Sequence, residues 1–251
     1  MLKYLTSSND LIQHRQFIEN LYKTCGRTYL HSYSSLEASY CQKKEKDMIT
    51  IIDLKAQIVS AFEKKNKDIW QCNFSGFPFL CEGNINLSTL ELYIYQIKKY
   101  LKANTVYFPL VYKTDFTIDG LMHFRNAYCW RRLSSPVITG DFKENTIWDR
   151  VRSRYGSRAD KQRELFEGNL FTKKLTLADL KDEITKVEKN SWKSKYKQDM
   201  HSRDNQIDFY SSIIKSGLAN ITFAYDKAVP VAFRIDAFSH DTLYVIKWSY
   251  D

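Results

Sequence analysis

LANITFAYD (218–226), AVPVAFRIDAF (228–238) and DTLYVIKWSYD (241–251) follow one another with only short polar breaks between them. These runs are rich in β-branched and aromatic residues, so they predict three consecutive strands. The first half of the chain carries a similar meander over 48–74. There a polar loop, a helix over 88–102 and a strand over 105–112 follow it.

The two halves are interpreted as variants of one unit, related by element order and not by residue identity. On this interpretation the second half lacks the helix and strand expected after Asp251, and we expect the chain to be incomplete as an enzyme. Helices are predicted before each meander, at 10–23, 34–41, 175–196 and 208–215. This alternation predicts an α/β fold with a mixed sheet (α+β), divided into domains at 1–141 and 142–251.

The bulk composition is that of a globular protein. Its 251 residues are 43% apolar and carry 38 Lys and Arg against 29 Asp and Glu, a net charge of +9, which favours anionic partners. Five cysteines without a CxxC pair predict reduced thiols and no zinc site. No segment has the apolar length of a membrane span, and we expect the protein to be cytoplasmic.

A basic stretch, RVRSRYGSRADKQR (150–163), separates the halves. Six of its side chains are cationic and only Asp160 is acidic. Two interpretations stay open: a solvated helix face, which is slightly favoured, and a surface for phosphate or RNA.

The second half also carries four short elements in a fixed order. They are Ser191-Trp192-Lys193 within VEKNSWKSK (187–195), Phe209-Tyr210, Pro230-Val231-Ala232 and Lys247-x-Ser249-Tyr250-Asp251.

This ordered set resembles the FemAB-like (CelD/BcsL-type) branch of the GNAT acyltransferase superfamily, over roughly residues 145–251. The resemblance implies tandem GNAT-like domains, a degenerate one at 1–141 and an incomplete acetyltransferase domain at 142–251. It implies acetyl-CoA or another acyl-CoA as co-substrate, no metal, and an amine or hydroxyl of a sugar or small molecule as acceptor, in surface-polysaccharide synthesis. In the family, the helix after the Ser-Tyr-Asp element receives the pyrophosphate of the donor at its N-terminus.

Direct acyl transfer needs a base, and three carboxylates are candidates: Asp251, Glu188 and Asp236. For Glu188 we favour an exposed helix position paired with a neighbouring lysine. Strand alternation places Arg234 and Asp236 on one face, where a surface ion pair is the first interpretation and substrate binding the second.

The resemblance implies that backbone N–H groups near Tyr244, Val245 and Ile246 hold the thioester carbonyl. Substrate-binding candidates come from the same elements. Trp192 fits an apolar helix stripe and is more typical of a core residue, while Lys247 and Ser249 share a strand face that either lines the acceptor cleft or is solvated. The full substrate-binding set is Trp192, Lys193, Arg234, Lys247, Ser249 and Tyr250.

Two alternatives belong to other classes of function. One is FemAB-type aminoacyl transfer from charged tRNA, with the basic stretch on the RNA backbone. The other is a non-catalytic, truncated paralogue that acts as an interaction partner, with a partner chain completing the second sheet at its exposed edge.

Overall fold

The structure is a computed structural model that describes residues 2–43, 47–74, 77–82, 85, 87–108, 149, 152–167, 170–171, 176–201 and 206–250. The predicted domain boundary at 141/142 and the segment 113–141 lie outside these ranges.

The first half is built on a mixed sheet with the strand order β1-β2-β3-β4-β6, in which β5 also pairs with β3. Every pairing is antiparallel except that of β4 with β6. The predicted meander is confirmed, whereas the sequence did not indicate the N-terminal strand. The strands are β1 (Leu2–Leu5), β2 (Met48–Asp53), β3 (Ile58–Lys64), β4 (Ile69–Cys72), β5 (Leu80–Cys81) and β6 (Thr105–Tyr107).

Helices flank this sheet: α1 (Ser8–Gln13), α2 (Arg15–Cys25), the 3-10 turn η1 (Tyr29–His31), α3 (Tyr33–Gln42) and α4 (Leu87–Leu101). The single helix predicted over 10–23 is wrong, because the helix breaks at His14, where φ is −110°. Ser7 is the N-cap, since its hydroxyl accepts the N–H of Asp10 at 3.1 Å.

The second half contains an antiparallel sheet with the order β10-β9-β8-β7. The three predicted C-terminal strands are confirmed as β8 (Ala219–Asp226), β9 (Val229–Ser239) and β10 (Thr242–Tyr250), joined by the short β7 (Leu170–Phe171). Gly217, with φ of +78°, follows the last helix of this half and ends it in the left-handed conformation that glycine adopts readily. The helices are α7 (Ser157–Glu167), α8 (Leu177–Asn190), α9 (Trp192–Lys195) and α10 (Gln206–Lys215).

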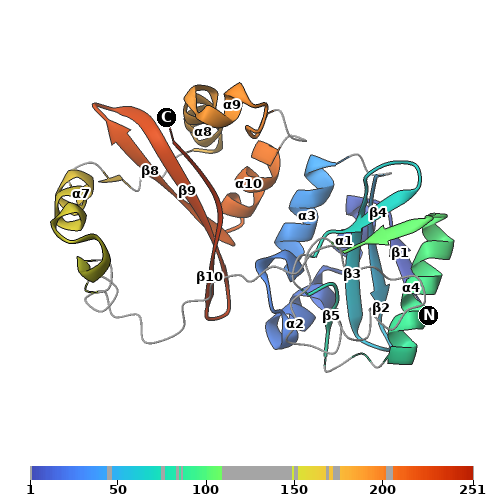
Figure 1. The fold of residues 1–251 in the computed structure, drawn as a ribbon. Helices are drawn as coiled ribbons and strands as arrows, with labels where there is room; N and C mark the ends of the chain where they lie inside the picture. The colour runs from blue at the N-terminus through green and yellow to red at the C-terminus, as the bar shows by residue number, and fades with distance from the viewer. Residues whose placement is uncertain are drawn as a thin grey trace.

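The two sheets are separated by helices (Figure 1). Helices α1 to α3 lie on the side of the first sheet that is turned toward the second half, and α4 lies on its other side. Helices α8 and α10 cover the side of the second sheet that is turned toward the first half, and α10 packs against α3. Along the chain, both halves have the same order of elements: one strand, then helices, then an antiparallel meander.

Polar contacts join the halves at the β9–β10 turn. The Tyr22 hydroxyl donates to Ser239 Oγ at 2.9 Å, and the Tyr244 hydroxyl donates to the Arg27 carbonyl at 2.7 Å. The Tyr29 ring lies 5.6 Å from that of Tyr244. These contacts fix β10 against the first half.

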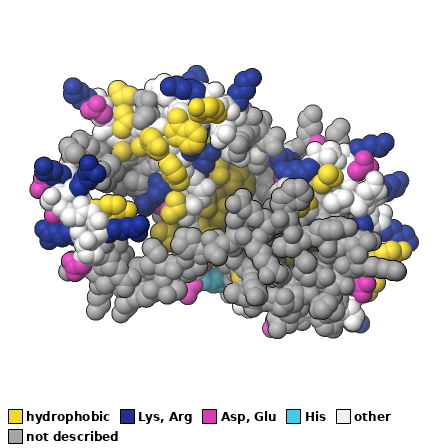
Figure 2. All heavy atoms as spheres, viewed as in Figure 1, with side chains coloured by type: hydrophobic (Ala, Val, Ile, Leu, Met, Phe, Trp, Pro, Cys, Tyr) yellow, Lys and Arg dark blue, Asp and Glu magenta, His cyan; other side chains and the backbone are white. Residues whose placement is uncertain are grey.

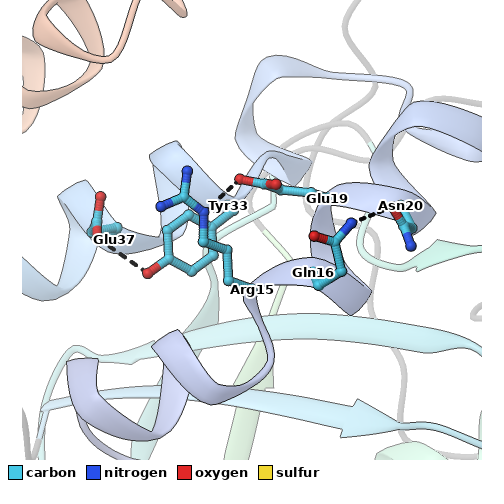
Figure 3. Close-up of polar contacts among 6 residues, drawn as sticks. All are labelled: Arg15, Gln16, Glu19, Asn20, Tyr33 and Glu37. Atoms are coloured by element: carbon cyan, nitrogen blue, oxygen red, sulfur yellow. Dashed lines mark hydrogen bonds and ion pairs between the residues drawn. The ribbon is translucent and has the colours of Figure 1, made fainter.

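Helices α2 and α3 are held together by a surface network (Figure 3). Arg15 pairs with Glu19 at 2.8 Å, and its guanidinium lies 5.0 Å from the centre of the Tyr33 ring. The Tyr33 hydroxyl in turn donates to Glu37 at 3.1 Å. Because Tyr33 is buried between these partners and only Arg15 is exposed, we assign the network a structural role.

Near this interface, His31 is fully buried. Its Nδ1 accepts the N–H of Arg27 at 3.3 Å and its Nε2 donates to the Phe77 carbonyl at 2.8 Å, an arrangement that requires the neutral ring. Burial lowers the pKa of His31 to about 4. The ordinary histidine pKa is about 6.5.

This histidine predicts a pH dependence of stability. Since the unfolded chain takes up a proton near pH 6.5 and the folded chain does not, the free energy of unfolding falls as pH drops from about 6.5 to about 4, by about 3 kcal/mol in all. Urea unfolding at pH 7 and pH 5 measures about 2 kcal/mol of this loss, since about 1.5 pH units of the interval lie above pH 5. His31→Gln should lose less over the same interval; equal losses in both proteins contradict the assignment.

Within the described ranges, no helix is both long enough and apolar enough to cross a membrane. Cys25, Cys41, Cys72 and Cys81 are free thiols, as predicted, and Cys129 lies outside those ranges.

Candidate functional site

Two of the four elements on which the family resemblance rests, those at Ser191-Trp192-Lys193 and in β10, meet at one corner of the second half. Helix α8 is capped by Thr176, whose hydroxyl accepts the N–H of Asp179 at 3.2 Å. It ends where the Ser191 hydroxyl donates to the Glu188 carbonyl at 2.9 Å, and α9 begins at Trp192. The predicted helix over 175–196 is thus split, and the turn brings α9 to the edge strand β10.

Glu188 lies inside this corner with 0% of its surface exposed. The expectation of an exposed residue paired with a lysine is wrong. Glu188 lies one turn after Ile184 and beside Val187, on the side of α8 that packs into the core of the second half. Its Oε2 accepts the N–H of Met200 at 2.8 Å, and its Oε1 has no hydrogen-bond partner in the part of the chain that the structure describes.

Lys193 joins the corner to β10. Its Nζ donates to the Trp248 carbonyl and lies 4.9 Å from the centre of that indole ring. Burial lowers the pKa of Lys193, and the nearby charge of Glu188 opposes this shift.

Tyr210, on α10, also lies close to Glu188. Burial, and then the Glu188 charge, raises the pKa of Tyr210 to about 12, so its hydroxyl stays protonated. The sequence showed Tyr210 only as part of the Phe209-Tyr210 element, with no indication of a role at this site.

Strand β10 turns Ser249 toward the helices. Ser249 lies opposite Phe233, a core residue, and is 1% exposed. Of the two alternatives for this strand face, solvation is therefore wrong for Ser249. Its Oγ has no hydrogen-bond partner among the described atoms. Lys247, opposite the core residue Ile235, lies on the same face and is half-buried.

A β-bulge interrupts β10 next to this face. Val245 lies opposite Asp236 and Lys247 lies opposite Ile235, so Ile246 has no partner residue in the register. An extra residue of this kind is unpaired in the ladder, and its backbone groups take new directions. The bulge lies in the segment Tyr244-Val245-Ile246, which the resemblance implies for carbonyl binding, but alternation of apolar residues gives no sign of it.

Arg234 and Asp236 form the predicted pair, with Arg234 Nε 2.9 Å from Asp236 Oδ2. They lie on the other face of the sheet, because their neighbours Phe233, Ile235 and Ala237 point into the core. Asp236 is only 6% exposed. The structure therefore does not bring Asp236 together with Glu188.

The remaining candidates are spread over the surface of the corner. Trp192 is 40% exposed, so its expected core position is wrong; its ring packs edge-on against Tyr196 at 6.3 Å. Tyr250 is exposed and stacks on Trp248, with 5.5 Å between ring centres. Trp248 was not among the predicted site residues, although it shares a strand face with Tyr250. Asp251 lies outside the described residues.

The basic stretch is separate from this corner. Helix α7 lies on the far side of the second sheet from α8 and α10 (Figure 1). Arg152 pairs with Asp160 at 3.0 Å on the surface, while Arg154, Arg158 and Lys161 are exposed. Arg150 is not described.

Among the residues that the structure describes, no group of three or more His, Cys, Asp and Glu side chains is arranged to hold a metal. Comparison with known proteins found no matching family model, no matching curated protein and no matching solved structure.

Proposed function

We propose that this chain is an acyltransferase of tandem GNAT-like architecture, which moves an acyl group from acyl-CoA to an amine or hydroxyl of a sugar or small molecule. One observation carries the proposal. The register gives Ile246 no partner residue, so a bulge interrupts β10, the strand that also carries the buried hydroxyl of Ser249 and meets the corner that holds the buried carboxylate of Glu188.

In this reaction the acceptor nitrogen or oxygen attacks the thioester carbonyl. A new C–N or C–O bond forms, the carbonyl oxygen gains negative charge, and the C–S bond then breaks as the thiolate leaves. A backbone N–H released by a bulge is a fixed donor for the developing oxyanion. We assign that role to the backbone at Ile246.

Glu188 supplies the base. The N–H of Met200 holds Oε2 at 2.8 Å, which leaves Oε1 to take the proton. Because the side chain is fully buried, the proton passes from the acceptor through a water molecule. The Ser249 hydroxyl, free on the same side of β10, donates to the substrate or to the departing thiolate.

Surface-polysaccharide synthesis in the cytoplasm remains the proposed setting. Aminoacyl transfer from tRNA and a non-catalytic role stay predictions, since no observation at this corner favours either.

Calorimetric titration of acetyl-CoA and longer acyl-CoA thioesters into the 251-residue chain tests the donor. We expect saturable heat for at least one thioester and weaker heat for free CoA. Absence of binding by the whole panel contradicts the proposal, and salt-dependent binding of tRNA in its place favours the aminoacyl-transfer alternative.

A further inference from the structure

The outer face of the second sheet, turned away from α8 and α10, carries large exposed hydrophobic side chains. The register places Leu243 opposite Phe238 and Trp248 opposite Arg234, so these residues share one face with Val245 and Tyr250. The outer apolar patch consists of Phe238 (47% exposed), Leu243 (51%), Val245 (56%), Trp248 (49%) and Tyr250 (47%).

A solvated face of an antiparallel sheet normally carries polar side chains. Here five large hydrophobic residues lie around the Arg234–Asp236 ion pair, and clustering of this kind marks an interaction surface. Figure 2 shows hydrophobic side chains next to Lys and Arg side chains over the second half.

The first half shows how a comparable sheet is covered. All six residues of β2 are buried, because helices pack on both faces of that sheet. Helix α4 contributes Leu90, Tyr93 and Ile97 to the core, an i, i+3, i+7 stripe. In the second half, the described helices that contact the sheet most are α8 and α10, which lie on its inner face.

The positive charge beside the outer apolar patch indicates which kind of partner binds there. Lys193, Lys195 and Lys197 lie on α9 and just after it, at the β10 edge where Lys193 contacts the Trp248 carbonyl. The chain as a whole carries a net charge of +9. Two copies of this basic edge repel each other, so complementarity favours an acidic partner over a second copy.

We propose that the outer apolar patch binds an amphipathic α-helix of a partner protein, with acidic residues beside its apolar stripe. The stripe packs on the patch as α4 packs on the first sheet, and the acidic residues face the lysines of α9. Trp248 is the expected anchor, since it is aromatic, exposed and held by Lys193 and Tyr250. This inference does not depend on the proposed catalytic function.

The probe is a labelled peptide with the sequence of α4, LSTLELYIYQIKKYL, in which Lys98 and Lys99 are replaced by glutamate. Fluorescence anisotropy with the 251-residue chain should give saturable binding, at least tenfold tighter than the unmodified peptide. Leu243→Asp, and independently Phe238→Ser, should each weaken binding at least tenfold. Ile12→Asp, at an exposed apolar position on α1 (54% exposed), is the matched control and should leave the affinity unchanged.

The proposal is overturned if the acidic peptide does not bind, or if it binds Leu243→Asp as tightly as the unmodified protein. It is also overturned by a dimer in sedimentation that Leu243→Asp dissociates, because a second copy then covers the patch. Binding of a single-stranded oligonucleotide that competes with the peptide and quenches Trp248 assigns the surface to nucleic acid.

Discussion

Deletion of Ile246 is expected to lower kcat/KM for acyl transfer by ~10²–10³-fold, the usual loss for one oxyanion donor. The deletion removes the extra residue of the bulge, so the backbone groups that the bulge releases return to the ladder. The measurement is the initial rate of thiol release from acyl-CoA with a saturating acceptor.

The fold should survive this deletion. Val245 already lies opposite Asp236, and Lys247 lies opposite the adjacent Ile235, so joining them produces a regular antiparallel ladder. Ser249 and Trp248 keep their faces, because the alternation beyond the bulge is unchanged. The lost packing of the half-buried Ile246 side chain should cost about 1–2 kcal/mol of unfolding free energy.

Ile246→Val is the matched control for this deletion. It retains the bulge and most of the side-chain volume, so we expect nearly the original rate. If the deletion variant is folded and as active as the Ile246→Val variant, the bulge does not bind the oxyanion.

Glu188→Gln is expected to lower kcat by ~10²–10⁴-fold, the range for loss of a general base. The amide oxygen can still accept the N–H of Met200, so the corner should stay folded. Thermal unfolding and acyl-CoA affinity should therefore change little while the rate falls.

Glu183→Gln is the control for Glu188→Gln, since Glu183 is a carboxylate on the same helix and pairs with Lys186 at 3.4 Å. Its rate should stay close to that of the unmodified protein. A Glu188→Gln protein that loses stability without losing rate assigns Glu188 a structural role at Met200.

The elements with strong local signals were predictable from sequence. The three C-terminal strands, α4 and the C-cap at Gly217 follow from periodicity and glycine chemistry. The strand Leu2–Leu5 was not predicted, because four residues show little alternation and the strand is fixed by its pairing with β2. The break at His14 was also missed, since the apolar spacing continues through it.

The candidate site was predicted only in part. Sequence spacing indicated the two elements that meet at the α8–β10 corner, but not the burial of Glu188, which depends on how α8 packs into the core. The spacing also predicted a core position for Trp192, which is wrong because Trp192 fits the apolar spacing of α8 but begins a separate helix. The bulge at Ile246 arises from the pairing of β10 with β9, so it cannot be recognised in the sequence of either strand alone.

Acyl transfer at the α8–β10 corner is tested by thiol release from a panel of acyl-CoA thioesters, with amino sugars and polyamines as acceptors. We expect acceptor-dependent release by the unmodified chain and its loss on deletion of Ile246. Acceptor-dependent release that is equally fast in the folded deletion variant, or no release with any pair of substrates, contradicts it.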